Sequence, residues 1–524
     1  MTLFSKLTWL MAAAGLVVYG LSFLGYILPL LNLILFFALL IVVLNLTLKK
    51  LEYGVLFVTF ELILGHKGYL FSWDINGQFV LSLRLASFFI VMLVWLIIVF
   101  KQKKIALIRT PYCWPLIAFA AICIGAITIG YLNGHDWSAN FFDFNGYLYF
   151  ALAFPFFEVI SRPDFVKKMV SILFGGIIAM SLITLFLFGD FFFTKQWARP
   201  DMSTAIATES ATAEEAAGGQ FAFGGITNRL YDESGKPVEY RWQKDLGLGM
   251  ISYVGGNFFR VSAAGQTWAL AGLLIGLFFL LRRNWRAPET RELIFLVVLC
   301  GATLIASFSR SLWVGAGGGM VALLFFLPRK KAILTLLIAT GLISAVAAGV
   351  YFVAPQSFHT VSDRITSIFN PSQELAGQNR LNLLDPIIVK IKNKPLSGHG
   401  FGTPIIYESV VPEKQGFIKV YMYEWGYLDQ LVKYGMLGLG VFAWLLVVVF
   451  RTARRATARL TASKQTDEKY LLIGLIIATI GLLATHFTSP YLNHPLGIGL
   501  ILITAALAFH YTPSLNNDRT PATS

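Results

Sequence analysis

Arginines beside apolar segments are the residues best suited to bind an anionic substrate. Arg260 precedes an apolar segment in the stretch GGNFFRVSAAGQ, and Arg310 lies between serines in SFSRS. Arg364 and Arg380 stand early in a long polar segment. A guanidinium at a hydrocarbon boundary is costly unless it reaches water or an anion, and its planar fork matches two phosphate oxygens. Converging arginines could therefore hold a diphosphate without a metal ion, whereas any single one could equally be an interfacial anchor.

Glu424 is the candidate general base. It lies in the aromatic stretch 421–427, where partial burial would make a carboxylate more basic. A positioned carboxylate of this kind could remove the proton of an attacking hydroxyl. The alternatives are an interfacial cap or an ion-pair partner for Lys419 or Lys433.

Two histidines are alternative bases. His399 lies in the glycine-rich stretch 393–402, and His486 is predicted at the outer end of a helix. No histidine has metal-motif spacing, and the three cysteines lie in apolar segments, so we expect no metal site and no cofactor. The alternating glycines of 393–402 lack the strand-turn-helix context of a phosphate loop and are expected to permit a tight turn.

The composition indicates that these residues are held by a membrane protein. Hydrophobic residues make up 56% of the 524 residues and charged residues only 13%, which excludes a soluble multi-domain enzyme. The net charge of +14 could suggest nucleic acid, but the basic residues fall mostly in short runs between apolar segments. The positive-inside rule explains that pattern, so we expect no nucleic-acid partner.

The apolar segments predict an all-α polytopic protein with about fourteen transmembrane helices. They begin near Leu7, Leu28, Tyr53, Phe79, Tyr112, Tyr147, Lys168, Ala263, Leu293, Leu312, Ala332, Gly435, Tyr470 and Leu496. The short basic connections all fall on the side of Lys6 and Lys49, which predicts that both termini are cytoplasmic. Arg310 is then a positive charge on the outer side, which favours a functional role for it.

Five regions follow from this topology. They are an N-terminal bundle (1–189), a first long periplasmic loop (190–262), central helices (263–354), a second long periplasmic loop (355–434) and a C-terminal part with the cytoplasmic tail (435–524). The second loop holds most of the candidate residues. Within the first apolar segments, Glu52, Glu61 and Arg84 could form a proton path, but structural pairing is the favoured interpretation.

The order of several short motifs resembles the C-terminal region of the bacterial O-antigen polymerase and O-antigen ligase superfamily. The motifs are SRS at 309–311, Arg380, NKPLSGHGFG at 393–402, and the stretch from Tyr427 to Gly438. The resemblance covers about Arg260 to Gly440.

This resemblance implies a metal-independent, inverting glycosyltransferase of the bacterial inner membrane. Its donor would be an oligosaccharide linked to undecaprenyl diphosphate, used on the periplasmic face to build O-antigen (the glycan of lipopolysaccharide) or exopolysaccharide. Arg310 and Arg260 would bind the diphosphate, assisted by Arg364 or Arg380. Membrane lipid and a regulator of chain length are the implied partners.

Glu424 separates the candidate functions. Ligases of this family resemble one another in having a histidine where this chain has Glu424, which favours a polymerase. The closest rival is an O-antigen ligase that transfers the glycan to lipid A core. A flippase for lipid-linked oligosaccharides is the rival of another class, and it would need a basic cavity reachable from both faces rather than two long outer loops.

Overall fold

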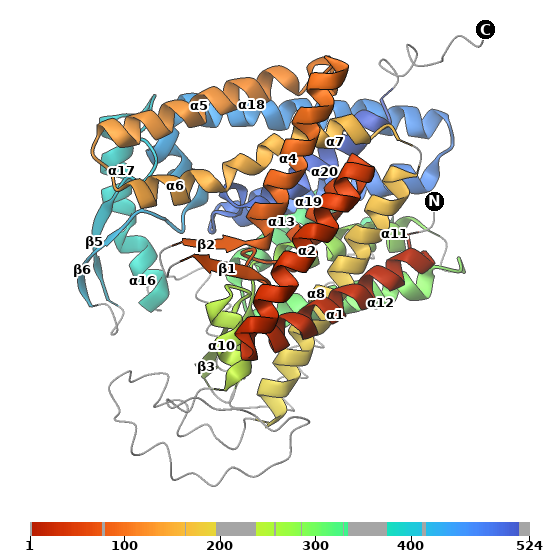
Figure 1. The fold of residues 1–524 in the computed structure, drawn as a ribbon, viewed down its shortest axis with the longest axis horizontal. Coiled ribbons are helices and arrows are strands. Elements are labelled where there is room, and N and C mark those ends of the chain that lie inside the picture. The colour runs from red at the N-terminus through yellow and green to blue at the C-terminus, as the bar shows by residue number, and fades with distance from the viewer. Residues whose placement is uncertain are drawn as a thin grey trace.

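The computed structural model describes residues 3–75, 79–162, 164–194, 237–255, 258–283, 286–328, 330–333, 375–410 and 415–512. Over this part the chain is a helical, polytopic membrane protein (Figure 1). Eight described helices are long and apolar enough to cross a membrane: α1 (Lys6–Ile27), α2 (Pro29–Lys49), α4 (Leu83–Gln102), α5 (Cys113–Leu132), α8 (Phe165–Thr194), α12 (Thr290–Ser307), α18 (Gly426–Ala462) and α19 (Thr466–His486). Three shorter apolar helices accompany them: α11 (Gln266–Arg282), α13 (Arg310–Phe325) and α20 (Pro495–His510).

Two of the expected spans are shorter than predicted. The segment expected to begin near Tyr53 is α3 (Leu51–Leu64), whose 14 residues cannot cross the hydrocarbon core, which is about 30 Å thick. The segment expected near Tyr147 is a 3-10 turn, η2 (Tyr147–Leu152), followed by the short helix α7 (Ala153–Val159). These apolar segments are buried against other helices, and apolar content alone does not distinguish that burial from a span. The segment expected near Ala332 lies almost entirely outside the described residues, so the count of about fourteen stays a prediction.

The first two helices meet at a proline turn. Leu28 joins α1 to α2, and Pro29 is the first residue of α2, where its missing N–H costs no hydrogen bond. At the other end of α1, Ser5 and Thr8 form a capping box.

The core of the bundle is built by α8, α11, α19 and α20. Helix α8 packs against α1 and α3, α11 against α12 and α19, and α18 against α5, α19 and α20. In Figure 1, α5 and α18 run side by side along the top of the molecule. The outer faces of α1 and α2 expose large apolar side chains, as expected for helices that face lipid.

Charged residues inside the bundle are paired, as the sequence indicated. Arg84 lies 2.6 Å from Glu61 with both side chains 3% exposed, and it also donates to the carbonyl oxygen of His66. Glu52 pairs with Lys168 at 3.1 Å. These contacts support structural pairing, because each buried charge has an opposite partner.

The remaining elements are short. They are η1 (Ala106–Arg109), α6 (Trp137–Asn145), α10 (Val238–Asp245), α16 (Leu375–Asn382), α17 (Leu384–Asn393), η7 (Tyr491–Asn493), and the antiparallel hairpins β1–β2 (Ser72–Ile75, Phe79–Ser82), β3–β4 (Met250–Gly255, Phe258–Ser262) and β5–β6 (Ile405–Ser409, Gly416–Val420).

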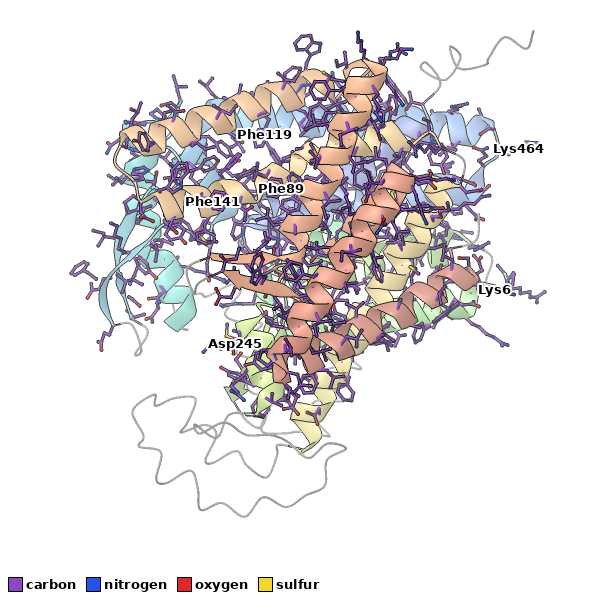
Figure 2. All side chains as sticks on the ribbon, viewed as in Figure 1. Lys6, Phe89, Phe119, Phe141, Asp245 and Lys464 are labelled. Carbon is purple, nitrogen blue, oxygen red and sulfur yellow. The ribbon has the colours of Figure 1, made fainter. Side chains whose placement is uncertain are left out.

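Figure 2 shows Lys6 and Lys464 at one end of the bundle, called the basic end below, and Phe141 at the opposite side. The hairpin β5–β6 lies with α17 on the side of Phe141 (Figure 1). The end at which α13 and α18 begin and α19 ends is called the outer end.

Candidate functional site

The glycine-rich loop is hydrogen-bonded to α18 at a break in that helix. Gly435 has φ 66° and ψ −171°, which interrupts the helical backbone after its first turns. The amides that follow the break donate to the loop instead: Met436 N–H to Pro395 O at 2.8 Å and Leu437 N–H to Leu396 O at 3.1 Å. The segment 395–402, called the motif loop below, is therefore held to α18 by backbone hydrogen bonds.

The glycines of the motif loop are required by its conformation. Gly398, Gly400 and Gly402 all have positive φ, between 68° and 91°, a region that other residues rarely adopt. A Cβ at Gly398 would lie 2.6 Å from the carbonyl carbon of Lys433, and a Cβ at Gly400 would overlap the backbone of Gly130 in α5. The expected tight turn is confirmed. It allows the motif loop to approach the backbones of α5 and α18 closely.

Beneath the motif loop lies a buried ionic cluster of Asp143, Asp429 and Lys433. The ammonium of Lys433 lies 2.7 Å from a carboxylate oxygen of each aspartate, and the three side chains are 4% exposed or less. The ammonium also lies 5.4 Å from the ring centre of Tyr423, a cation-π contact. The sequence suggests Lys433 only as a partner of Glu424. The i,i+4 spacing of Asp429 and Lys433 in an apolar helix was a signal for their pairing, but nothing local to either residue points to Asp143.

The ionic cluster joins four parts of the chain. Asp143 of α6 accepts a hydrogen bond from the Gly402 N–H at 2.8 Å, and Asp429 of α18 accepts one from Asn493 Nδ2 at 2.6 Å. The hydroxyl of Tyr147 donates to Asn493 Oδ1 at 2.6 Å. Because α6, α18, η7 and the motif loop converge here, the cluster fixes the beginning of α18, where Glu424 stands.

Glu424 is exposed and forms an ion pair with Arg380. Its side chain is 58% exposed, so the expected partial burial is wrong, and neither Lys419 nor Lys433 is its partner. Arg380 lies in the last turn of α16, and its carbonyl oxygen accepts a hydrogen bond from Trp425 Nε1 at 3.0 Å. Burial, followed by the nearby Glu424 carboxylate, raises the pKa of Tyr407. Two residues chosen from distant motifs, the candidate base and a candidate diphosphate ligand, thus lie in contact.

His399 is held by the main chain. Its Nε2 lies 2.8 Å from the Lys390 carbonyl oxygen, which can only accept, so Nε2 carries the proton. Burial lowers the pKa of His399. The ring is therefore a weaker base than an ordinary histidine, and it acts as a brace between α17 and the motif loop.

His486 lies behind the beginning of α18. It is fully buried, its Nδ1 accepts from the Leu492 N–H at 3.1 Å, and its ring meets that of Tyr427 edge-on at 4.7 Å. A Cβ at Gly426 would overlap the His486 carbonyl oxygen. His486 therefore lies close to the segment that carries Glu424, but it contacts backbone and an aromatic ring.

Arg310 begins α13 at a tight turn between α12 and α13. Phe308 ends α12 in the left-handed conformation with φ 49°, and the hydroxyls of Ser309 and Ser311 lie 3.0 Å apart on either side of Arg310. Helix α13 packs along α19 so closely that a Cβ at Gly315 would overlap the Thr485 hydroxyl. Arg310, the first residue of α13, is therefore at the outer end, where α19 ends.

Arg260 lies in β4, opposite Ser252 of β3, and its Nε donates to the Ser252 hydroxyl at 2.7 Å. Strand β4 packs against α12, the helix that leads to Arg310. Arg364 lies outside the described residues. The described residues contain no cluster of three or more His, Cys, Asp or Glu side chains that could hold a metal ion.

The site therefore has two parts at the outer end. Glu424 is exposed and Arg380 partly exposed beside the beginning of α18, while Arg310 begins α13 and Arg260 lies in the β3–β4 hairpin, which packs against α12. Helix α19 connects the parts, because its last turns contact both α13 and the beginning of α18. Such an arrangement can bind an anion and place a carboxylate beside it.

A comparison with protein families finds a match over part of the chain. Residues 295–443 match a family model described as O-antigen ligase. The matched region spans α12, α13, the motif loop and the first half of α18. None of the curated proteins compared matches the chain.

Proposed function

We propose that this chain, whose residues 295–443 match a family model described as O-antigen ligase, is a polysaccharide polymerase of the bacterial inner membrane. It transfers a growing glycan from undecaprenyl diphosphate to the sugar hydroxyl of another lipid-linked repeat unit, on the periplasmic face. A chain-length regulator is a suitable partner for such an enzyme. A flippase for lipid-linked oligosaccharides stays the alternative of another class, and the match to a family model described as O-antigen ligase supports the choice of a transferase.

The contact between Glu424 and Arg380 carries this proposal. Glu424 takes the proton of the acceptor hydroxyl, whose oxygen attacks the anomeric carbon as the bond to the diphosphate breaks with inversion. The leaving diphosphate gains negative charge, which guanidinium groups stabilise. A bound diphosphate competes for Arg380 and draws it from Glu424, so donor binding frees the carboxylate to act as the base.

The other arginines would hold the donor. Arg310 stands at the first residue of α13, where the helix dipole adds to its positive charge. Arg260 would approach from the adjoining hairpin, and Arg364 remains a candidate on sequence alone.

A ligase is the second candidate, because the matching family is described as O-antigen ligase. The presence of Glu424, where ligases of this family have histidine, favours the polymerase. The two differ only in the acceptor, lipid-linked repeat unit or lipid A core.

The purified protein is expected to convert a lipid-linked repeat unit alone into a ladder of longer glycans. The products are separated by gel electrophoresis and identified by mass spectrometry. Transfer only when lipid A core is added would support the ligase instead. Transport across vesicles without a new glycosidic bond would contradict both transferases.

The topology can be tested with reporter fusions. A reporter active only in the periplasm is expected to work near Ser234 or Gly377 and to fail near Arg286 or Ala458, because short basic connections stay in the cytoplasm. Enzyme activity of each fusion, normalised to protein level, is the measurement. The reverse pattern would invert the topology and remove the periplasmic site.

Arg310→Lys is expected to lose most activity although it keeps the charge, because lysine cannot bind two oxygens of one phosphate in a fork. The expected loss of transition-state stabilisation is about 2 to 4 kcal/mol, as for one preorganised donor to a developing anion. Rates are measured on purified protein with lipid-linked substrate. Normal rates in both Arg310→Lys and Arg310→Ala would make Arg310 an interfacial anchor.

A further inference from the structure

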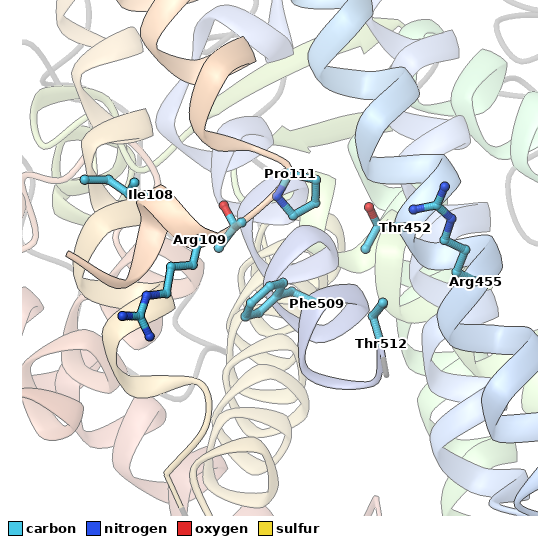
Figure 3. Close-up of a pocket in the computed structure, with 8 residues that line it drawn as sticks. Ile108, Arg109, Pro111, Thr452, Arg455, Phe509 and Thr512 are labelled. Carbon is cyan, nitrogen blue, oxygen red and sulfur yellow. The ribbon is translucent and has the colours of Figure 1, made fainter. Parts of the chain in front are cut away.

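A cavity of about 320 Å³ lies at the basic end of the bundle, away from the candidate site. It is enclosed by η1, the residues just before α5, the last turns of α18 and the end of α20 (Figure 3). Its lining residues are Ile108, Arg109, Thr110, Pro111, Thr452, Arg455, Phe509 and Thr512. Two arginines and no acidic residue line it, so the cavity is suited to an anion.

The arginines come from opposite walls. Figure 3 shows Arg455 directed toward Thr452 on one side of Phe509, and Arg109 on the other side with its guanidinium directed away from Phe509. Over the part of the chain that the structure describes, neither guanidinium forms an ion pair with a carboxylate. The hydroxyls of Thr110 and Thr452 donate to carbonyl oxygens of their own segments. The arginines therefore supply the positive charge, and both remain available to an outside ligand.

One edge of the cavity is apolar and faces outward. Ile108 is 62% exposed, and Trp114, just beyond Pro111 at the start of α5, is 72% exposed. Tryptophan at a helix end is typical of the boundary between hydrocarbon and headgroups. On α18, Arg451, Arg454 and Arg455 follow directly on the apolar segment, which indicates the same depth. The cavity thus lies where a lipid headgroup would lie.

We propose that this cavity binds the phosphodiester of an anionic phospholipid. Arg455, which is directed toward Thr452, holds the phosphate oxygens, Arg109 adds positive charge on the other side of Phe509, and the acyl chains run outside the bundle past Ile108 and Trp114. Basic pockets between transmembrane helices recognise anionic headgroups in this way. The apolar edge distinguishes a lipid from free phosphate, because free phosphate would gain nothing from exposed Ile108 and Trp114. The bound lipid joins α5, α18 and α20 at the end opposite the site.

The test uses the full-length protein in detergent and native mass spectrometry. Phosphatidylglycerol and phosphatidylcholine are added at equal mole fraction, and the fraction of protein that retains each lipid is measured. Wild type is expected to retain phosphatidylglycerol preferentially. The variant Arg109→Gln/Arg455→Gln is expected to bind it about 10- to 30-fold more weakly, since each basic residue contributes about fivefold near an anionic surface.

The matched control is Arg451→Gln/Arg454→Gln, which removes two exposed arginines of α18 outside the cavity. It is expected to retain phosphatidylglycerol like wild type. Equal losses in both double variants would overturn the proposal, since general charge would then explain binding. Displacement of the lipid by millimolar inorganic phosphate would also overturn it, in favour of a site for free phosphate.

In the wild type, retention of phosphatidylglycerol is expected to fall as salt rises, and retention unaffected by salt would contradict the role of the arginines.

Discussion

Glu424→Gln is expected to lower the initial rate of glycan transfer by about 10²- to 10⁴-fold, the usual contribution of a positioned base. Glutamine keeps the shape of the side chain and its hydrogen bonds but cannot take the hydroxyl proton. Because the exposed carboxylate pairs with Arg380, the substitution also removes a competitor for this guanidinium. Binding of the lipid-linked donor is therefore expected to be unchanged or tighter, while transfer is lost. Donor binding and rate are measured separately on the purified protein.

Glu408→Gln is the matched control, because Glu408 is an exposed glutamate on the neighbouring strand β5 and lies outside the proposed contact. It is expected to retain wild-type rates. Glu424→Asp is expected to keep a fraction of activity. A wild-type rate in Glu424→Gln, combined with loss of product in His399→Ala or His486→Ala, would assign the base to a histidine. Full activity in Glu424→Gln, His399→Ala and His486→Ala would show that none of these side chains is an essential base and that catalysis rests on the arginines.

Lys433→Met is expected to destabilise the protein by about 3 to 5 kcal/mol, as when one partner of a buried ion pair is removed. Methionine fills similar space but leaves Asp143 and Asp429 buried without their cation. Since the same aspartates hold Gly402 and Asn493, the motif loop and η7 lose their shared anchor. The measurement is the midpoint of thermal unfolding in detergent, with activity recorded below that midpoint.

Lys419→Met serves as the control, since this lysine is exposed on β6, and its stability is expected to change by no more than about 0.5 kcal/mol. Adding Asp143→Asn and Asp429→Asn to Lys433→Met is expected to recover part of the lost stability, because no unpaired charge is then buried. An unchanged unfolding midpoint in Lys433→Met would show that the cluster does not hold the site together.

The sequence by itself determined the features that depend on local chemistry. Apolar composition and the runs of basic residues identified a polytopic membrane protein, and Pro29 marked the turn between α1 and α2. The serines around Arg310 marked a tight turn between helices, which the structure has. Alternating glycines marked a tight loop. Each of these features follows from hydration, helix termination or allowed φ, which a short segment specifies without its neighbours.

Only the tertiary structure decided which distant residues meet. It placed Glu424 in solvent against Arg380, although its aromatic neighbours suggested burial. Tyr423 and Tyr427 instead donate to the carbonyl oxygens of Thr403 and Leu483, and Trp425 donates to that of Arg380. The tertiary structure likewise brought Asp143 into contact with Lys433 and placed Arg109 and Arg455 in the lining of one cavity. An apolar segment can be covered equally well by lipid or by another helix, so apolar content does not specify its partners. Pairing between remote charges is selected by the packing of whole helices, and that packing sets which ionisable groups share one site.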